Sequence, residues 1–174
     1  MTRWLTGDEV AAAADRLVPA SVARSDSMAC YLTPATLVEV CTALRDDKDM
    51  DLKHLTNLCG VDYWERFEVV YHVQSFDKNQ IATLKVEVLG REGLAVPSVV
   101  PVWYGAWMQE CEAYDLLGIR FEGHPNLHRL LLWDGYPGYP LRKDFLAIPG
   151  SQQTGLGDHH GSTPHEPPPV KVVE

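Results

Sequence analysis

Cysteine is scarce in this chain and widely spaced. The four cysteines are Cys30, Cys41, Cys59 and Cys111, and no two of them lie within three residues of each other. This excludes the C-x-x-C spacing that zinc and iron–sulfur sites commonly use. An even number would allow two disulfides. However, a chain of 174 residues with no evident signal peptide favours reduced, mostly buried thiols in a cytosolic-type compartment.

Positive charge and long apolar runs are also lacking. The 15 Lys and Arg stand against 24 Asp and Glu, a formal net charge of -9. That balance argues against a nucleic-acid partner but leaves a basic protein partner open. The longest charge-free run, Gly93 to Gln109, falls short of the roughly 18–20 residues that span a bilayer, and Pro97 and Pro101 interrupt it. We therefore expect a chain that does not cross a membrane by itself.

The residues that are present favour one α+β domain with a hydrophobic core. Apolar residues make up 45% of the chain, which is ordinary for a globular protein. Thr6 and Glu9 form a T-x-x-E capping box, which predicts a helix that runs to about Leu17. Thr33 and Pro34 predict the start of a second helix. Its buried face is expected to carry Leu37, Val40, Cys41 and Leu44, which recur at helical spacing.

The middle of the chain is rich in β-forming residues. An exposed link from Arg45 to Lys53 is expected to lead into it. Strands are predicted over 52–63, 67–75 and 81–89, with a turn at 77–79 and a loop at 90–97. Their alternation of apolar and polar residues predicts a small antiparallel sheet with one buried face, flanked by the helices.

A third helix is predicted after Pro101. It should end at Gly118, which suits the left-handed position beyond a helix C-terminus. One face of this helix carries Trp103, Trp107, Glu110, Tyr114 and Leu117. The apolar members are expected in the core, whereas Glu110 needs a partner there because a lone buried charge is costly. A short extended piece should follow at 119–121, and later prolines then exclude long regular structure.

Composition divides the chain into two parts. Residues 1–146 are expected to form a globular domain that carries the most informative segment, 107–145. Residues 147–174 are rich in Gly, Pro, His and Ser and offer little to bury, so they are expected to be extended, either disordered or laid along a partner. We predict that this tail is protease-sensitive in the isolated chain and protected in a complex. Without a partner, its composition cannot offset an ordering cost of about 1–2 kcal/mol per residue.

Segment 107–145 concentrates charge but lacks the parts of an active site. It has no glycine-rich phosphate loop and no nucleophile beside a base. Glu110, Glu112 and Asp115 could serve acid–base chemistry or hold a divalent ion. The commoner fate of such acids is a salt bridge, and three arginines are near in sequence: Arg120, Arg129 and Arg142. We therefore favour salt-bridged structural acids.

Histidines offer a second, weaker hypothesis. His124 and His128 stand four residues apart, as metal-binding pairs on helices do. Pro125 lies between them and no neighbouring Glu completes a metalloprotease pattern, so His124 is expected instead to cap a turn and donate to a carbonyl. The tail carries His159, His160 and His165, which resemble a weak metal-binding tract but are more typical of a solvated segment.

Two local arrangements follow from these residues. Gly123 and Pro125 shape a turn after the third helix, and we predict that Arg129 pairs with at least one of the three carboxylates and fixes the turn against the helix. Farther along, prolines hold the stretch with Arg142, Lys143 and Asp144 extended. An Arg there suits a carboxylate on another chain, so Arg142→Ala is expected to hinder assembly while the isolated chain stays folded.

The spacing of these residues resembles one family. The pattern comprises Trp107, Glu110, Glu112, Asp115, Gly118, Phe121, Gly123, His124, Pro125, Leu127, Arg129 and the run from Pro140 to Phe145. It is similar to the thirty-kilodalton subunit of NADH-quinone oxidoreductase (respiratory complex I) over roughly residues 52–145. Three positions depart from the pattern: Cys111 and His128 stand where arginines are usual, and Asn126 where an Asp is usual.

The resemblance implies a cofactor-free subunit of the hydrophilic arm, with an α+β domain and an extended C-terminal segment that lies on a partner. Its partners would be the large quinone-site subunit and the subunit that carries the terminal iron–sulfur cluster. Flavin, iron–sulfur clusters and quinone would belong to partner subunits, and the complex would lie at the cytoplasmic side of a bacterial inner membrane. Two alternatives stay open: a homologous subunit of a membrane-bound nickel–iron hydrogenase or another quinone-linked dehydrogenase, and a stand-alone metalloenzyme.

Overall fold

The computed structural model describes residues 2–145, and the predicted tail, 147–174, lies outside them. The helices are α1 (Gly7–Leu17), the short 3₁₀ helix η1 (Pro34–Thr36), α2 (Leu37–Asp46) and α3 (Ala106–Leu117). The strands are β1 (Arg3–Trp4), β2 (Val22–Ser25), β3 (Cys30–Leu32), β4 (His54–Asp62), β5 (Arg66–Ser75), β6 (Gln80–Leu89), β7 (Ala95–Pro97) and β8 (Arg120–Glu122). The α+β class is confirmed.

The predicted meander forms the centre of the main sheet. Strands β4, β5 and β6 pair antiparallel, and the turn between β5 and β6 ends at Asn79, whose φ is 52°. The whole sheet has the order β2-β3-β6-β5-β4, with β1 also beside β6. Both β1 and β3 run parallel to β6, so the sheet is mixed rather than purely antiparallel. The sequence did not predict β1, β2 and β3, because strands of two to four residues carry no clear alternation.

Helix α1 begins as its capping box predicts. The Thr6 Oγ1 accepts a hydrogen bond from the Glu9 amide at 3.2 Å, and the Glu9 carboxylate accepts one from the Thr6 amide at 2.9 Å. These two bonds satisfy backbone donors that the first helical turn leaves without a partner. The predicted second helix starts as η1 at Pro34 and continues as α2.

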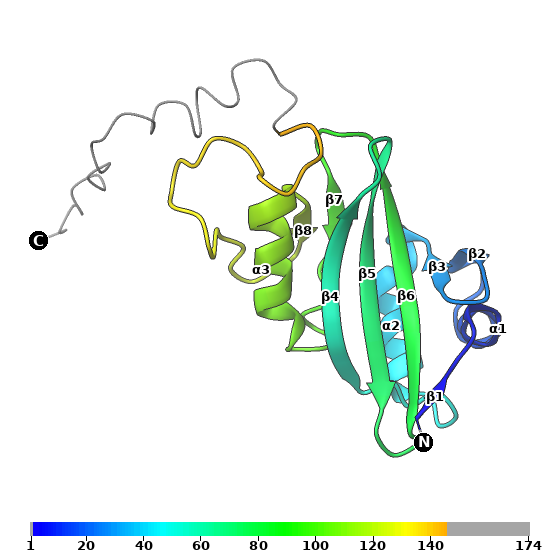
Figure 1. The fold of residues 1–174 in the computed structure, drawn as a ribbon. Helices are drawn as coiled ribbons and strands as arrows, with labels where there is room; N and C mark the ends of the chain where they lie inside the picture. The colour runs from blue at the N-terminus through cyan, green and yellow to red at the C-terminus, as the bar shows by residue number, and fades with distance from the viewer. Residues whose placement is uncertain (1, 146–174) are drawn as a thin grey trace, which may run out of the picture.

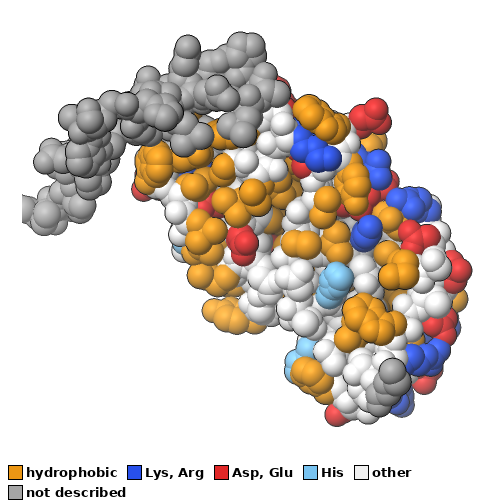
Figure 2. All heavy atoms as spheres, in the orientation of Figure 1, with side chains coloured by type: hydrophobic (Ala, Val, Ile, Leu, Met, Phe, Trp, Pro, Cys, Tyr) orange, Lys and Arg blue, Asp and Glu red, His pale blue; other side chains and the backbone are white. Residues whose placement is uncertain are grey.

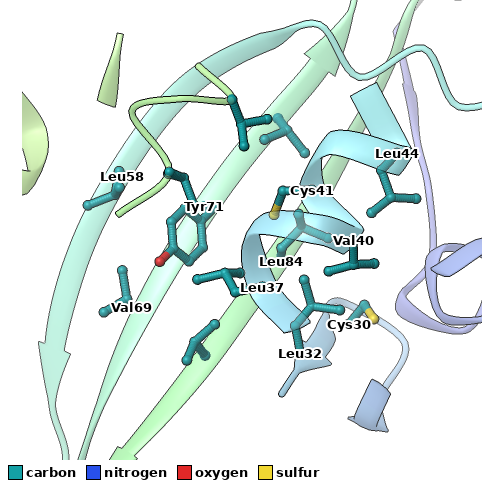
Figure 3. Close-up of a cluster of buried hydrophobic side chains, with 14 of the residues drawn as sticks. Cys30, Leu32, Leu37, Val40, Cys41, Leu44, Leu58, Val69, Tyr71 and Leu84 are labelled. Atoms are coloured by element: carbon teal, nitrogen blue, oxygen red, sulfur yellow. The ribbon is translucent and has the colours of Figure 1, made fainter. Parts of the chain in front are cut away.

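One face of α2 forms the core against the sheet. Leu37, Val40, Cys41 and Leu44 are all fully buried, as predicted. Figure 3 shows them turned toward Tyr71 of β5 and Leu84 of β6. Burial of each large apolar side chain stabilises the fold by roughly 1.5–3 kcal/mol, so this contact holds α2 in place. In Figure 1, α2 lies behind the sheet and α3 stands beside its edge strand β4.

Three boundary predictions need correction. The link at 45–53 is not wholly exposed, because Met50, Asp51 and Leu52 are buried at its end. The loop at 90–97 contains β7, which pairs parallel with β8 in a separate two-stranded sheet. The third helix starts at Ala106 rather than directly after Pro101, since the amides of Val102 and Trp103 both donate to the carbonyl of Val99 in tight turns.

The state of the cysteines agrees with the prediction of reduced, mostly buried thiols. All four cysteines are free thiols; Cys30, Cys41 and Cys111 are buried, while Cys59 is exposed. Burial raises the pKa of Cys30 to about 12, which keeps that thiol protonated and unreactive.

No helix within residues 2–145 has both the length and the apolar character needed to span a bilayer.

Candidate functional site

Segment 107–145 runs along the side of the sheet. It consists of α3, then β8, then a stretch from Gly123 to Phe145 that has neither helix nor strand. Figure 1 shows this stretch passing around the outside of α3 and returning to the end of the sheet where β4 meets β5. A hydrogen bond from the Leu141 amide to the Leu116 carbonyl, 3.1 Å, ties it back to α3.

Asp115 organises the first half of that stretch. Its carboxylate is fully buried, and Oδ2 accepts hydrogen bonds from three successive amides, those of Leu130, Leu131 and Leu132, at 3.0, 2.7 and 2.9 Å. Oδ1 lies 3.0 Å from the Arg129 guanidinium. Burial acts to raise the pKa of Asp115, but these donors outweigh it and hold the pKa below its usual range. The predicted pairing of Arg129 with one of the three acids is confirmed.

Arg129 also binds the chain beyond it. Its guanidinium donates to the carbonyls of Tyr136 and Gly138 at 3.3 and 3.2 Å and stacks over the ring of Tyr139. One side chain therefore joins α3 to both parts of the loop. The three acids, however, were expected to be salt-bridged, and only Asp115 is.

Glu110 is held by neutral groups. Its side chain is fully buried and accepts hydrogen bonds from the Ser98 hydroxyl at 2.7 Å and the Val99 amide at 2.8 Å. Burial raises the pKa of Glu110 to about 7, and the two hydrogen bonds only partly offset this effect. The expected salt bridge is wrong here because β7 and the turn after it, rather than an arginine, pack over this part of α3. Glu110 thus fixes that turn to the helix.

Glu112 points the other way. It is exposed, and within residues 2–145 no hydrogen bond or ion pair is formed by its side chain. The salt-bridge expectation is therefore wrong for Glu112 as well: Arg129 pairs with Asp115, and Arg142 donates to backbone carbonyls. Its carboxylate borders a shallow hollow between α3 and β4.

The Gly-His-Pro turn has the predicted capping role. Gly123 takes a φ of 80°, a conformation that suits glycine. The Asn126 amide donates to Nδ1 of His124 at 3.0 Å, so Nε2 carries the proton and donates to the Trp107 carbonyl at 3.1 Å. Pro125 follows in the turn, where its ring fixes φ.

The three positions that depart from the family pattern lie together. The Cys111 Sγ is 3.7 Å from the Asn126 carbonyl oxygen and 4.0 Å from Nδ1 of His128. His124 Nε2 is 3.8 Å from the same sulfur. Across residues 2–145, no group of three or more His, Cys, Asp or Glu is arranged to hold a metal ion. A metal centre made of His124, His128 and the acids at 110–115 is therefore not formed, since Glu110 and Asp115 are turned to other partners.

The stretch with Arg142, Lys143 and Asp144 is bound to the body of the chain. Arg142 donates to the carbonyls of Leu117 at 2.6 Å and Arg91 at 2.9 Å, and burial lowers its pKa. The stretch is not held away from the body as expected, because the loop folds back on the end of α3. Pairing of Arg142 with another chain's carboxylate stays a prediction. Asp144 lies 2.8 Å from Arg91. These contacts give Arg142 and Asp144 internal structural roles.

Sequence reasoning missed the residue that completes this arrangement. Arg91 bridges Asp144 and Asp62, with guanidinium–carboxylate distances of 2.6 and 2.9 Å to Asp62. The Lys143 amide also donates to Asp62 at 2.9 Å. These residues are separated by 29 to 81 positions in the chain, so no local spacing could have indicated their contact.

Comparisons with known proteins agree on one family. The family model for the respiratory-chain NADH dehydrogenase 30 Kd subunit matches residues 30–151. An NADH-quinone oxidoreductase subunit from Coxiella burnetii is 40% identical over 165 residues, which covers 75% of this chain and 72% of that protein. Its counterpart from Roseiflexus castenholzii is 44% identical over 137 residues, 77% of this chain and 78% of that protein. For the counterpart from Brucella abortus the values are 44% over 134 residues, 75% and 65%.

A solved structure shares the fold. A chain of the membrane-bound sulfane sulfur reductase, an archaeal respiratory membrane complex, superposes with a TM-score of 0.68 at 18% identity. The match covers 96% of this chain and 99% of that chain. At this identity the likeness concerns the fold only.

Proposed function

Because the chain belongs to the family of the respiratory-chain NADH dehydrogenase 30 Kd subunit, we propose that it is a structural and assembly subunit of an NADH-quinone oxidoreductase. Its partners would be the large quinone-site subunit and the subunit with the terminal iron–sulfur cluster. Flavin, iron–sulfur clusters and quinone would reside in partner subunits. Electron transfer from NADH to quinone would then be an activity of the whole assembly, at the cytoplasmic side of the membrane.

One observation supports a shape-forming role above others. Asp115, which an acid–base or metal mechanism would need to be accessible, and its partner Arg129 hold backbone groups of the loop at 130–138. The carboxylate is fully buried, and Arg129 is only 17% exposed. A charged pair placed in this way cannot reach a substrate, but it fixes the form of the surface that another subunit would contact.

Affinity purification from native membranes tests this proposal. The full-length tagged chain is expected to co-elute with the other subunits of an NADH-quinone oxidoreductase, which mass spectrometry would identify. A chain that elutes by itself from membranes containing an active complex would contradict it. A hydrogenase or another quinone-linked enzyme among the co-eluting proteins would instead favour the alternative.

A further inference from the structure

A hollow lies between α3 and the edge strand β4, on the outer side of the molecule. It has a volume of about 80 Å³ and is open to solvent. Leu58, Cys59 and Gly60 of β4 line one wall, and Ala113 and Leu116 of α3 line the other. Leu141 also lines the hollow. The Gln109 side chain accepts a hydrogen bond from the Leu58 amide, so at this point the edge of the sheet is already occupied by α3. We call this hollow the α3–β4 groove.

The surroundings of the α3–β4 groove are apolar and unusually exposed. Leu141, which lines the groove, has an exposed fraction of 59%. Met108 of α3 and Tyr104 just before α3 have exposed fractions of 52% and 76%. Figure 2 shows hydrophobic side chains gathered over the side of the molecule where α3 lies. Clustered exposed apolar side chains typically mark a surface that another molecule covers.

Glu112 limits what can cover the groove. It is the one charged residue that lines it, and within residues 2–145 its carboxylate has no hydrogen-bonding or ionic partner. An unpaired carboxylate that stays hydrated carries no free-energy penalty. Under an apolar covering segment the same carboxylate would lose its hydration, and a desolvated charge without a counter-charge is strongly unfavourable.

We propose that the α3–β4 groove binds an apolar segment of another subunit, and that this segment carries one lysine or arginine that pairs with Glu112. The inference rests on the proposed function and adds to it the face that is used and the chemistry of the partner. Aliphatic side chains of the segment lie against Leu116 and Leu141. The cation meets Glu112 at the rim, where an arginine can bind both carboxylate oxygens.

A second copy of this chain fits less well. Two copies related by a two-fold axis would place the same patch, with its Glu112, on both sides of the contact. Each chain also has a formal net charge of -9. Like charges facing each other oppose such a contact, so a chain with basic character at this point is the better match.

Cys59 offers a direct probe of the groove. It is the only one of the four cysteines that is exposed, and it lines the groove. A maleimide, read out by mass spectrometry, should modify Cys59 in the isolated full-length chain and should fail to modify it in the purified complex. As a control, Cys59→Ser combined with Asp77→Cys moves the thiol to the exposed turn between β5 and β6, where labelling should be the same in both states.

Charge variants of Glu112 test the chemistry of the partner. Loss of a charge-assisted hydrogen bond should weaken the association of Glu112→Gln with the other subunits by roughly tenfold or more. Glu112→Lys should abolish it, and neither variant should change the unfolding midpoint of the isolated chain. Glu92→Gln, at an exposed acid outside the groove, should assemble normally. A lysine or arginine of the partner, replaced by glutamate, should restore assembly of Glu112→Lys.

The outcomes separate this inference from the proposed function. If the chain co-purifies with the complex while Cys59 stays fully reactive, or while Glu112→Lys assembles normally, the groove is not the contact but the function stands. Protection of Cys59 already in the isolated chain would show that the chain's own residues cover the groove, which also overturns the inference. Failure to co-purify at all would instead contradict the proposed function.

Discussion

At the scale of single residues, the three acids of α3 show how burial decides the role of a carboxylate. Both carboxylates are buried, but their hydrogen-bond donors differ. Asp115 accepts from one guanidinium and three amides, whereas Glu110 accepts from only two neutral groups. The pKa of Asp115 is lowered and that of Glu110 is raised to about 7. The balance between desolvation and donors accounts for the opposite directions.

Arg129→Ala tests the charged pair at Asp115. Removal of the guanidinium leaves a fully buried carboxylate with its amide donors but without a counter-charge, and frees the carbonyls of Tyr136 and Gly138. We expect the free energy of unfolding to fall by about 3 kcal/mol, measured by urea denaturation. Arg120→Ala, at an exposed arginine, should cost less than about 0.5 kcal/mol. Equal effects in the two variants would show that the pair at Asp115 contributes little.

Glu110 predicts a pH-dependent stability. Its pKa is raised in the folded chain to about 7, so the folded state retains a proton that the unfolded state has already lost, and stability should fall as pH rises from 5 to 8. The expected loss is about 2–3 kcal/mol. His72, whose pKa is lowered by burial, acts in the opposite direction below its usual pKa. The measurement is therefore the difference between wild type and Glu110→Gln across this range. A difference that does not change with pH would refute the prediction.

At the scale of elements, the end of α3 is where the loop is anchored. Gly118 has a φ of 73°, and a Cβ at this position would meet Tyr139 at 2.5 Å and Arg142 at 2.6 Å. The predicted left-handed conformation is confirmed, but it is only part of the reason for a glycine. The backbone of α3 also has to approach the returning loop closely enough for Arg142 to reach the Leu117 carbonyl.

A comparison of Gly118→Ala with Gly135→Ala should separate the cost of the left-handed conformation from the cost of close packing. Gly135 also has a positive φ, 87°, but nothing lies within 4 Å of an added Cβ. Gly135→Ala should cost about 1 kcal/mol, the conformational contribution. Gly118→Ala should cost about 2–4 kcal/mol, because overpacking adds about 1–3 kcal/mol to the conformational cost. Similar thermal unfolding midpoints for the two variants would contradict the packing argument.

At the scale of the whole molecule, one arginine joins segments from three parts of the chain. Arg91 follows β6, while its partners Asp62 and Asp144 lie at the end of β4 and at the end of segment 107–145. Its guanidinium also donates to the Trp64 carbonyl and stacks on the ring of Phe67. The position of the C-terminal part of the described chain therefore depends on this residue.

Arg91→Ala should loosen that part of the molecule in particular. We expect the free energy of unfolding to fall by about 3 kcal/mol, as for other buried ionic networks. Hydrogen exchange should become faster at the Lys143 amide, which donates to Asp62 in the wild type. Arg16→Ala provides the control, because Arg16 is half exposed and pairs with Asp47 far from this region. It should cost less than about 1 kcal/mol and leave exchange at Lys143 unchanged. Unchanged exchange in Arg91→Ala would contradict the anchoring role.

The sequence by itself determined the elements whose signals are local. The capping box of Thr6 and Glu9, the apolar face of α2 and the alternation in β5 and β6 depend on residues a few positions apart. Turns and caps are of the same kind: Gly118 and Gly123 have the positive φ that their neighbours indicated. Local backbone geometry and the period of the side chains are enough to set these features, without contacts to distant segments.

The tertiary structure decided which distant groups meet. Arg129 pairs with Asp115, and Ser98 rather than an arginine binds Glu110. Arg142 donates to the Leu117 carbonyl, because the loop folds back on α3. The tertiary structure also left Glu112 in an apolar groove, and it placed the short strands β1 and β3 beside β6. The energy of a charge depends on its solvation and on the donors that approach it. Those donors come from segments that only folding brings together, so no spacing in the sequence reports them.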